Sequence, residues 1–167
     1  MTVTVRRADP QDAAALVELA QSVGGEPEGW LIASGEWRSA ADERRYLRAV
    51  RRHPNAAVFV AEERDAIVGR LSIARDPHPA SEHVADIGLM VALRHRRLGV
   101  GTALMQAAEE WATRAGISKV ELHVFPYNEP AIAFYRGLGY VEEGLRRRHF
   151  RRGADLLDAV LMAKVLV

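Results

Sequence analysis

Two short segments of the sequence combine residue types that could hold an anion and move a proton. The first, RHRRLGVGTALM at residues 94–105, runs from four basic residues into Gly99 and Gly101 and then into helix-forming residues. The N-terminus of a helix presents N–H groups without intrahelical partners and carries a partial positive charge. Glycines let the backbone approach a bound anion closely, with successive N–H groups pointing at it. This segment therefore predicts a loop that binds phosphate groups.

Other glycine-rich motifs fit this segment less well. A P-loop requires a lysine after its last glycine, whereas Thr102 follows Gly101. A dinucleotide-binding fingerprint requires a third small residue, and Leu104 stands at that position. A tight turn that only packs a helix onto a strand stays an alternative.

The second segment, FPYNEPAIAFYRGLGYVEEG, offers an asparagine and a tyrosine on one predicted helix. Tyr135 could donate a proton, because a phenol with a pKa near 10 can protonate a departing thiolate. Each residue also has a structural alternative. Asn128 could simply cap the helix, and Tyr135 shares a helical apolar stripe with Ala131, Phe134 and Leu138.

Together, the two segments resemble the sequence motifs of the GNAT superfamily of N-acetyltransferases. Residues 96–101 match the pyrophosphate-loop pattern R/Q-x-x-G-x-G/A, and the second segment matches N-x-x-A-x-x-x-Y-x-x-x-G-F/Y. The resemblance extends from about Ala57 to the end of the chain, and the N-terminal strand and two helices also fit. The tail, EGLRRRHFRRGADLLDAVLMAK, resembles most closely the amino-acid, phosphinothricin-type and ribosomal-protein-type acetyltransferases.

This resemblance implies that acetyl-CoA is the co-substrate and lies between splayed central strands, with no metal. It assigns the cofactor contacts to Leu89, Met90, Val91, Arg96, Arg97, Leu98, Gly99, Val100, Gly101, Thr102, Asn128, Ala131 and Tyr135. Tyr135 would also protonate the departing thiolate. Direct transfer in a ternary complex, without a covalent intermediate, agrees with the absence of cysteine.

The general base is less clear from the sequence. An amine must lose a proton before it attacks, because a lysine amine has a pKa near 10.4 and an α-amine near 8. Asp86 occupies a strand position where relatives often carry glutamate, and it could act through water or bind the cationic amine. Glu121 and His123 share one face of the next strand. The base is therefore Asp86, Glu121, His123 or water.

The acceptor is expected to be a primary amine of a small molecule, such as an amino acid. Acetylation of a protein N-terminus and a non-catalytic CoA-binding or sensor domain are the alternatives. Trp30 and Trp37 fall where this superfamily builds the acceptor pocket. The basic residues at 146–152 could form a solvated turn, bind a carboxylate or phosphate, or bind nucleic acid, although the net charge of +1 argues against a nucleic-acid module.

Chain length, cysteine content and the lengths of apolar runs indicate the broad class of protein. A chain of 167 residues predicts a single domain, residues 1–167, with room for a core. It has no cysteine, no apolar run of the roughly 20 residues that cross a bilayer, and no apolar signal segment. We therefore expect a soluble cytoplasmic protein without a membrane or nucleic-acid partner. A homodimer through the C-terminal strands is an expectation from the superfamily alone.

Alternation, helix periodicity and caps predict the order β α α β β β α β α β β. The helices are expected at about 10–22, 40–53, 100–115 and 129–139, and the last strand at 156–167. Antiparallel succession with one central strand–helix–strand unit predicts a mixed, mostly antiparallel α/β sheet with helices on both faces. This is the fold that the GNAT resemblance also implies.

Overall fold

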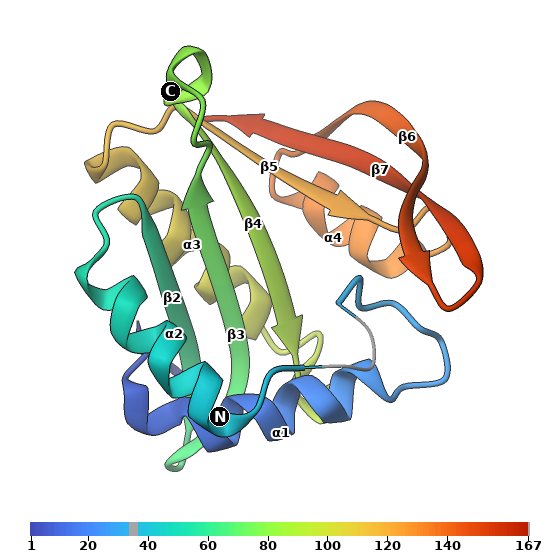
Figure 1. The fold of residues 1–167 in the computed structure, drawn as a ribbon. Helices are drawn as coiled ribbons and strands as arrows, with labels where there is room; N and C mark the ends of the chain where they lie inside the picture. The colour runs from blue at the N-terminus through green and yellow to red at the C-terminus, as the bar shows by residue number, and fades with distance from the viewer. Residues whose placement is uncertain (34–36, 167) are drawn as a thin grey trace.

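The computed structural model describes residues 1–33 and 37–166, and its elements follow the predicted order (Figure 1). The strands are β1 (Thr4–Arg7), β2 (Ala56–Glu63), β3 (Ala66–Arg75), β4 (Val84–Val91), β5 (Lys119–Val124), β6 (Val141–Arg152) and β7 (Asp155–Val165). The helices are α1 (Ala13–Gly24), α2 (Ala40–Arg52), α3 (Val100–Arg114) and α4 (Glu129–Gly137). Of the predicted last strand, Val167 lies outside the described residues.

The strands form one seven-stranded sheet in the order β1-β2-β3-β4-β5-β7-β6. Every neighbouring pair is antiparallel except β4 and β5, which are parallel. The mixed, mostly antiparallel sheet predicted from the sequence is thus confirmed. Strands β4 and β5 start side by side and then diverge, which opens the sheet in its middle (Figure 1).

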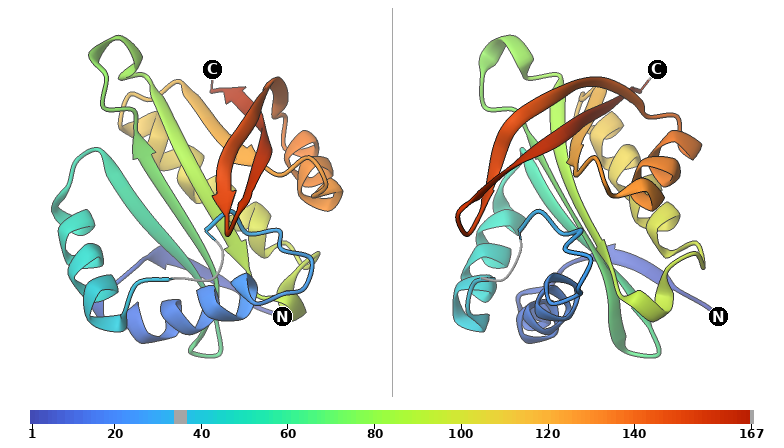
Figure 2. Two further views of the ribbon diagram at one scale, coloured as in Figure 1. Left: turned by 45° about the vertical axis from the view of Figure 1, so that its right-hand side comes forward. Right: turned by 90° about the vertical axis from the view of Figure 1, so that its right-hand side faces the viewer.

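Helices cover both faces of the sheet, as predicted, with α1 and α2 on one face and α3 and α4 on the other (Figure 2). Leu16 of α1 and Leu47 of α2 belong to a buried cluster that includes Val60 of β2. Leu104 of α3 and Ile132 of α4 belong to the second, larger cluster. The two clusters pack on opposite faces of the sheet and hold its central strands in place.

The N-terminus of α1 differs slightly from the prediction. Asp9 and Asp12 form the predicted capping box, but the residues from Pro10 to Asp12 are a 3-10 turn, and the α-helix begins at Ala13. Proline fixes its own φ and lacks an N–H group, which suits the start of a helix. Ser39 caps α2 as predicted, because its side chain accepts a hydrogen bond from Asp42 N.

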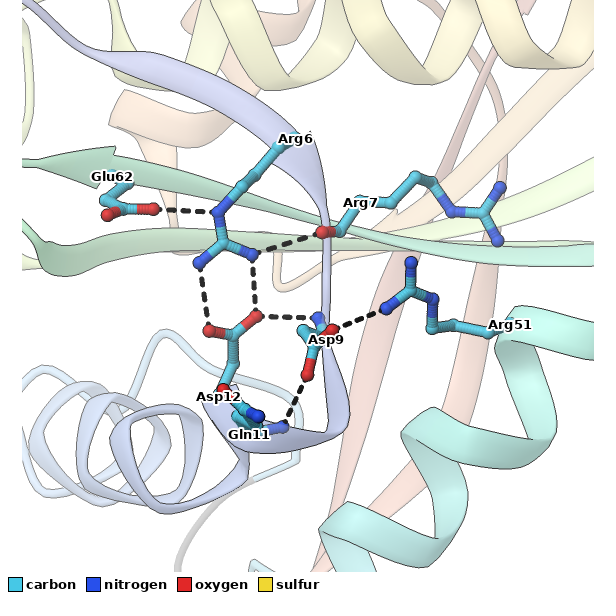
Figure 3. A network of polar contacts seen from close by, with 7 residues as sticks. All are labelled: Arg6, Arg7, Asp9, Gln11, Asp12, Arg51 and Glu62. Carbon is cyan, nitrogen blue, oxygen red and sulfur yellow. Dashed lines mark hydrogen bonds and ion pairs between the residues drawn. The ribbon is translucent and has the colours of Figure 1, made fainter.

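An ion-pair network fastens this turn to the sheet and to α2 (Figure 3). The Arg6 guanidinium donates to both carboxylate oxygens of Asp12, at 2.8 and 2.9 Å, and to Glu62 on β2 at 2.7 Å. Arg51 of α2 donates to Asp9 at 2.6 Å. The network holds α1 and α2 against strands β1 and β2 at one edge of the sheet. It does not involve the glycine loop at residues 96–101.

The basic residues at 146–152 do not form the solvated turn considered above. They lie on β6, the edge strand of the sheet, where it pairs with β7 through a register shift between Arg146 and Phe150. Arg148 has a φ of 51°, and its N–H donates to Asp158 at 2.7 Å. Only Phe150 and Arg152 of this segment are half-buried, while the others are exposed.

Candidate active site

The divergence of β4 and β5 creates a cleft of about 340 Å³ in the middle of the sheet. Parallel pairing covers only three residue pairs and ends at Asp86 and Glu121, although β4 continues to Val91 and β5 to Val124. The cleft is lined by β3, β4, β5, α4, one residue of β6 and the segment between α1 and α2. It is therefore bordered by elements from both faces of the sheet.

The register of β3 and β4 decides which backbone groups of β4 face this cleft. Gly69 pairs with Val91, and Ala92 N donates to Val68 O at 2.9 Å. In an antiparallel ladder this arrangement turns the N–H and C=O groups of Val91, and of Leu89 two residues earlier, away from β3. Since β5 has already separated, the groups of Leu89 and the N–H group of Val91 face the open fork between β4 and β5, whereas Val91 O accepts a hydrogen bond from Arg96 Nε.

Met90 differs from its two neighbours. Its backbone groups point toward β3, and its side chain is buried in the α1–α2 core, where it forms part of the cleft wall. Of the three β4 residues that the resemblance named, Leu89 and Val91 thus offer backbone groups to a ligand, whereas Met90 offers its side chain.

The loop that follows β4 leads directly into α3, as the sequence predicts. Gly99 is the N-cap and has a φ of 86°, a left-handed conformation that glycine adopts without steric cost. Gly101 is needed for a different reason, because a Cβ there would lie 3.0 Å from Cζ of Phe134 on α4. The first hydrogen bond into the helix runs from Ala103 N to Gly99 O, at 3.0 Å. The preceding N–H groups are therefore available to an anion.

The side chains of this loop behave differently from one another. Val100 is buried under the sheet, Thr102 is half-buried, and Arg97, with a φ of 61°, and Leu98 are exposed. Arg96 is not free to contact phosphate as the sequence suggested. Its guanidinium forms two hydrogen bonds with Glu26, at 2.8 and 2.6 Å, and its Nε donates to Val91 O at 2.9 Å.

Helix α4 supplies the other residues of the second motif to the same cleft. Asn128 is buried and caps the helix, with its Oδ1 accepting from Ala131 N at 3.3 Å. Asn128, Ala131 and Tyr135 all line the cleft. Burial raises the pKa of the Tyr135 phenol above its usual value, so the phenol keeps its proton in neutral solution. Tyr135 is 8% exposed.

Asp86 and His123 meet where the fork closes. Their side chains come from neighbouring strands, and His123 Nδ1 lies 3.7 Å from Asp86 Oδ2. The His123 ring stacks on His149 at 5.6 Å between centroids, and its buried Nε2 has no hydrogen-bond partner among the described residues. Both Asp86 and His123 line the cleft, whereas Glu121, the third candidate base, does not.

The described part of the segment between α1 and α2, residues 25–33 and 37–39, closes the cleft from the α1–α2 face, with Trp30 and Trp37 in its lining. It is held from β6 by Arg152, whose guanidinium donates to Gly29 O and Leu31 O, both at 2.8 Å. Tyr127 also donates to Gly29 O, at 2.6 Å. Sequence reasoning treated Arg152 as one member of a basic cluster and missed this contact.

Arg70 of β3 is a cleft residue that the sequence interpretation did not single out. It is 4% exposed and lies near the fully buried carboxylate of Glu43 on α2, with 3.7 Å between Arg70 Nη2 and Glu43 Oε1. An arginine in the apolar stretch AIVGRLSIAR was the signal, because a charged residue in a buried strand requires a partner or a ligand.

Within residues 1–33 and 37–166, no three histidine or acidic side chains gather closely enough to hold a metal ion. In the same part of the chain, no helix is both long and apolar enough to cross a membrane.

The sequence is similar to those of known N-acetyltransferases. The sequence profile described as "Acetyltransferase (GNAT) family" matches residues 24–140. An L-amino acid N-acetyltransferase of Escherichia coli K12 is 36% identical over 100 residues, which are 59% of this chain and 62% of that protein. An N-alpha-acetyltransferase of Sulfurisphaera tokodaii is 34% identical over 122 residues, or 66% of this chain and 70% of that protein.

Structural similarity extends over the whole chain. The structure of yncA from Salmonella typhimurium, solved with its cofactor acetyl-CoA, superimposes with a TM-score of 0.86 at 20% identity, and covers 100% of this chain and 95% of that one. By sequence, however, the match spans less than two thirds of the length of the Escherichia coli relative.

Proposed function

The chain belongs to the GNAT acetyltransferase family, and we propose that it transfers the acetyl group of acetyl-CoA directly to a primary amine, such as that of an amino acid. The observation that carries this proposal is the fork between β4 and β5, which joins the glycine loop to the buried phenol of Tyr135. Residues 1–167 would act as one catalytic domain.

The donor groups around the fork fit acetyl-CoA. The open N–H groups at the start of α3 suit the pyrophosphate, while the exposed Arg97 stands nearby as a further cation. The backbone groups of Leu89 and the N–H group of Val91 suit the amides of the pantetheine arm, since they would extend the sheet by hydrogen bonds. Asn128 and Ala131 would contact the same arm from α4.

When bound, acetyl-CoA supplies an activated acetyl group whose thiol leaves as the amide bond forms. The chain would move the two protons involved. Tyr135 lines the cleft with its phenol protonated at neutral pH and would donate this proton to the departing thiolate. Asp86 and His123 would accept the proton that the amine loses. Because Glu121 is absent from the cleft lining, we do not assign the base to it.

Calorimetric titration with acetyl-CoA, with ATP and NADH as controls, tests the cofactor assignment. Binding of acetyl-CoA with a micromolar dissociation constant, and no binding of either control, is the expected result. Binding of ATP or NADH in place of acetyl-CoA would contradict the assignment of the glycine loop.

Two alternatives share this cofactor site. An acetyltransferase of protein N-termini would bind acetyl-CoA in the same way but acetylate peptides, as the name of the Sulfurisphaera tokodaii relative suggests. A non-catalytic CoA sensor would bind acetyl-CoA without turnover. An assay of free thiol release with amino acids, primary amines and peptides as acceptors separates all three.

A further inference from the structure

A cluster of charged and aromatic side chains, of which Arg70 and Glu43 are buried, Trp37 is half-buried and Arg38 is exposed, forms the wall of the cleft on the α1–α2 face. Its centre is Arg70, whose guanidinium lies 5.1 Å from the ring centroid of Trp37. Glu43, the acidic member, accepts from Arg38 Nη1 at 2.8 Å through its second oxygen. Arg70 and Trp37 both line the cleft, whereas Glu43 and Arg38 lie behind them.

The hydrogen bonds of this cluster are incomplete. Three buried polar atoms of the cluster have no hydrogen-bond partner among the described residues: the donors Arg70 Nε and Trp37 Nε1, whose residues line the cleft, and the acceptor Glu43 Oε1 behind them. A buried donor without a partner costs free energy, because it has lost its bond to water and gained nothing in return. Two such donors on neighbouring side chains of one cleft indicate a ligand that accepts hydrogen bonds.

The charges of the cluster are also unbalanced. Two guanidinium groups, Arg38 and Arg70, face the single carboxylate of Glu43. The distance from Glu43 to Arg70 is 3.7 Å, too long for a hydrogen bond, so this carboxylate pairs mainly with Arg38. Burial also lowers the pKa of Arg70, which means that its cation is poorly solvated. An anion bound in the cleft would correct this imbalance.

The cluster lies close to the place where acetyl transfer would occur. Arg70 pairs with Met90, which stands between Leu89 and Val91, the two residues whose backbone groups face the fork. Asp86 lies four residues before Met90 on the same face of β4, about 13 Å along the strand. Arg70, Trp37 and Leu89 line the same cleft, so an acceptor whose carboxylate contacts Arg70 would lie in the cleft that the acetyl group enters.

We propose that the acceptor is a small amine that carries a carboxylate, as an α-amino acid does, and that Arg70 and the indole N–H of Trp37 bind this carboxylate. The inference rests on the proposed acetyl transfer and makes its substrate class specific. The terminal amine of a protein offers a neutral amide at the corresponding position, which would leave the excess positive charge of the cluster uncompensated.

The experiment compares the proteinogenic L-amino acids with their carboxamides as acceptors, with saturating acetyl-CoA. The expected result is that the best amino acid exceeds its own carboxamide about 100-fold or more in kcat/KM, because a guanidinium built to bind a carboxylate loses a charge-assisted bond with the amide. Arg70→Met should lower kcat/KM for the acid by a similar factor and leave that for the amide unchanged.

Two further variants make the test specific. Trp37→Phe removes one N–H group and little volume, so it should reduce the acid preference about 10-fold even where Arg70→Met does not fold. Arg48→Met is the control, because Arg48 is an exposed arginine of α2 that does not line the cleft, and it should leave the acid preference unchanged.

The outcomes separate the two proposals. Equal acetylation of acids and amides by the unmodified protein, or a preference for peptides, would overturn the carboxylate site while acetyl transfer stands. If amino acids, their amides, other primary amines and peptides all fail as acceptors, the proposed function fails and the carboxylate site fails with it.

Discussion

Asp86 on β4 and Glu121 on β5 form the last pair of the parallel ladder, and the two strands diverge beyond them. This pair marks the base of the cleft, which Asp86 lines and Glu121 does not. The consequence is chemical as well as geometric. The strand ends beyond this pair leave backbone donors and acceptors open to a ligand, although they lie in the middle of a seven-stranded sheet.

Replacing Tyr135 by phenylalanine should lower kcat by about 100-fold or more, since a positioned general acid contributes a factor of that order. The affinity for acetyl-CoA should stay within about twofold, because only the hydroxyl is removed. Thiol-release kinetics and calorimetry measure the two quantities. Tyr140→Phe is the control, because Tyr140 is also buried but donates to Glu109 at 3.1 Å outside the cleft. Unchanged turnover in Tyr135→Phe would remove the phenol from the mechanism.

Gly99→Ala should weaken acetyl-CoA binding about 10-fold or more. A side chain at a φ of 86° is strained by about 1–2 kcal/mol, and its relief would turn the N–H groups of the loop. Gly116→Ala is matched to it, since Gly116 has a φ of 76° and also has open space around it, but it lies beyond the opposite end of α3. Titration of both variants with acetyl-CoA should show the loss only for Gly99→Ala; equal affinities would contradict the loop assignment.

Asp86 and His123 should act as a unit in removing the amine proton. Asp86→Asn and His123→Gln should each lower kcat, by about 100-fold, and the double variant should lose little more than either single variant. The affinity for acetyl-CoA should not change. Steady-state kinetics of the three variants test this, with the exposed Asp65→Asn as the control. Independent, multiplicative losses would show that the two residues serve different steps.

The Arg6–Asp12 pair should make stability depend on pH in a defined direction. Burial acts to raise the pKa of Asp12, but the hydrogen bonds from Arg6 and from Asp9 N outweigh it and bring the pKa below its ordinary 3.8. The stabilisation is therefore complete above pH 3.8 and is lost as the pH falls through the lower value of the folded state. At pH 7, Asp12→Asn should cost about 1–2 kcal/mol.

Thermal unfolding of the unmodified chain and Asp12→Asn between pH 2 and pH 7 measures this difference. The two melting temperatures should converge as the solution becomes more acidic. A constant gap across this range would mean that the pair does not titrate with folding.

Much of the fold could be predicted because its signals are local. Ser39, Gly99 and the Asp9–Asp12 capping box each mark a helix start within a few residues of sequence. Alternation predicted that Glu121 and His123 share a face of one strand, and the family resemblance made Asp86 a candidate before its proximity to His123 was known. The divergence of β4 and β5 came from the family resemblance, not from any local pattern.

The remaining features depend on partners that are distant in sequence. Arg96 looked like a phosphate contact until Glu26, 70 residues away, was seen to hold it. The role of Arg70 on β3 can be recognised only once the fold brings it near Glu43 of α2. Arg152 resembled its exposed neighbours in sequence, and only the fold turns it toward the segment that covers the cleft. Charge alone could not predict these pairings, because the chain has 23 lysines and arginines and 22 acidic residues, and the sequence does not show which of them meet in the fold.

The most direct test of the account is to incubate the protein with acetyl-CoA and a mixture of the twenty amino acids, and to identify N-acetylated products by mass spectrometry. The account predicts one or a few N-acetyl amino acids, formed in a one-to-one ratio with free thiol, and their loss in Tyr135→Phe. Acetyl-CoA that stays intact with amino acids, small amines and peptides alike would contradict it.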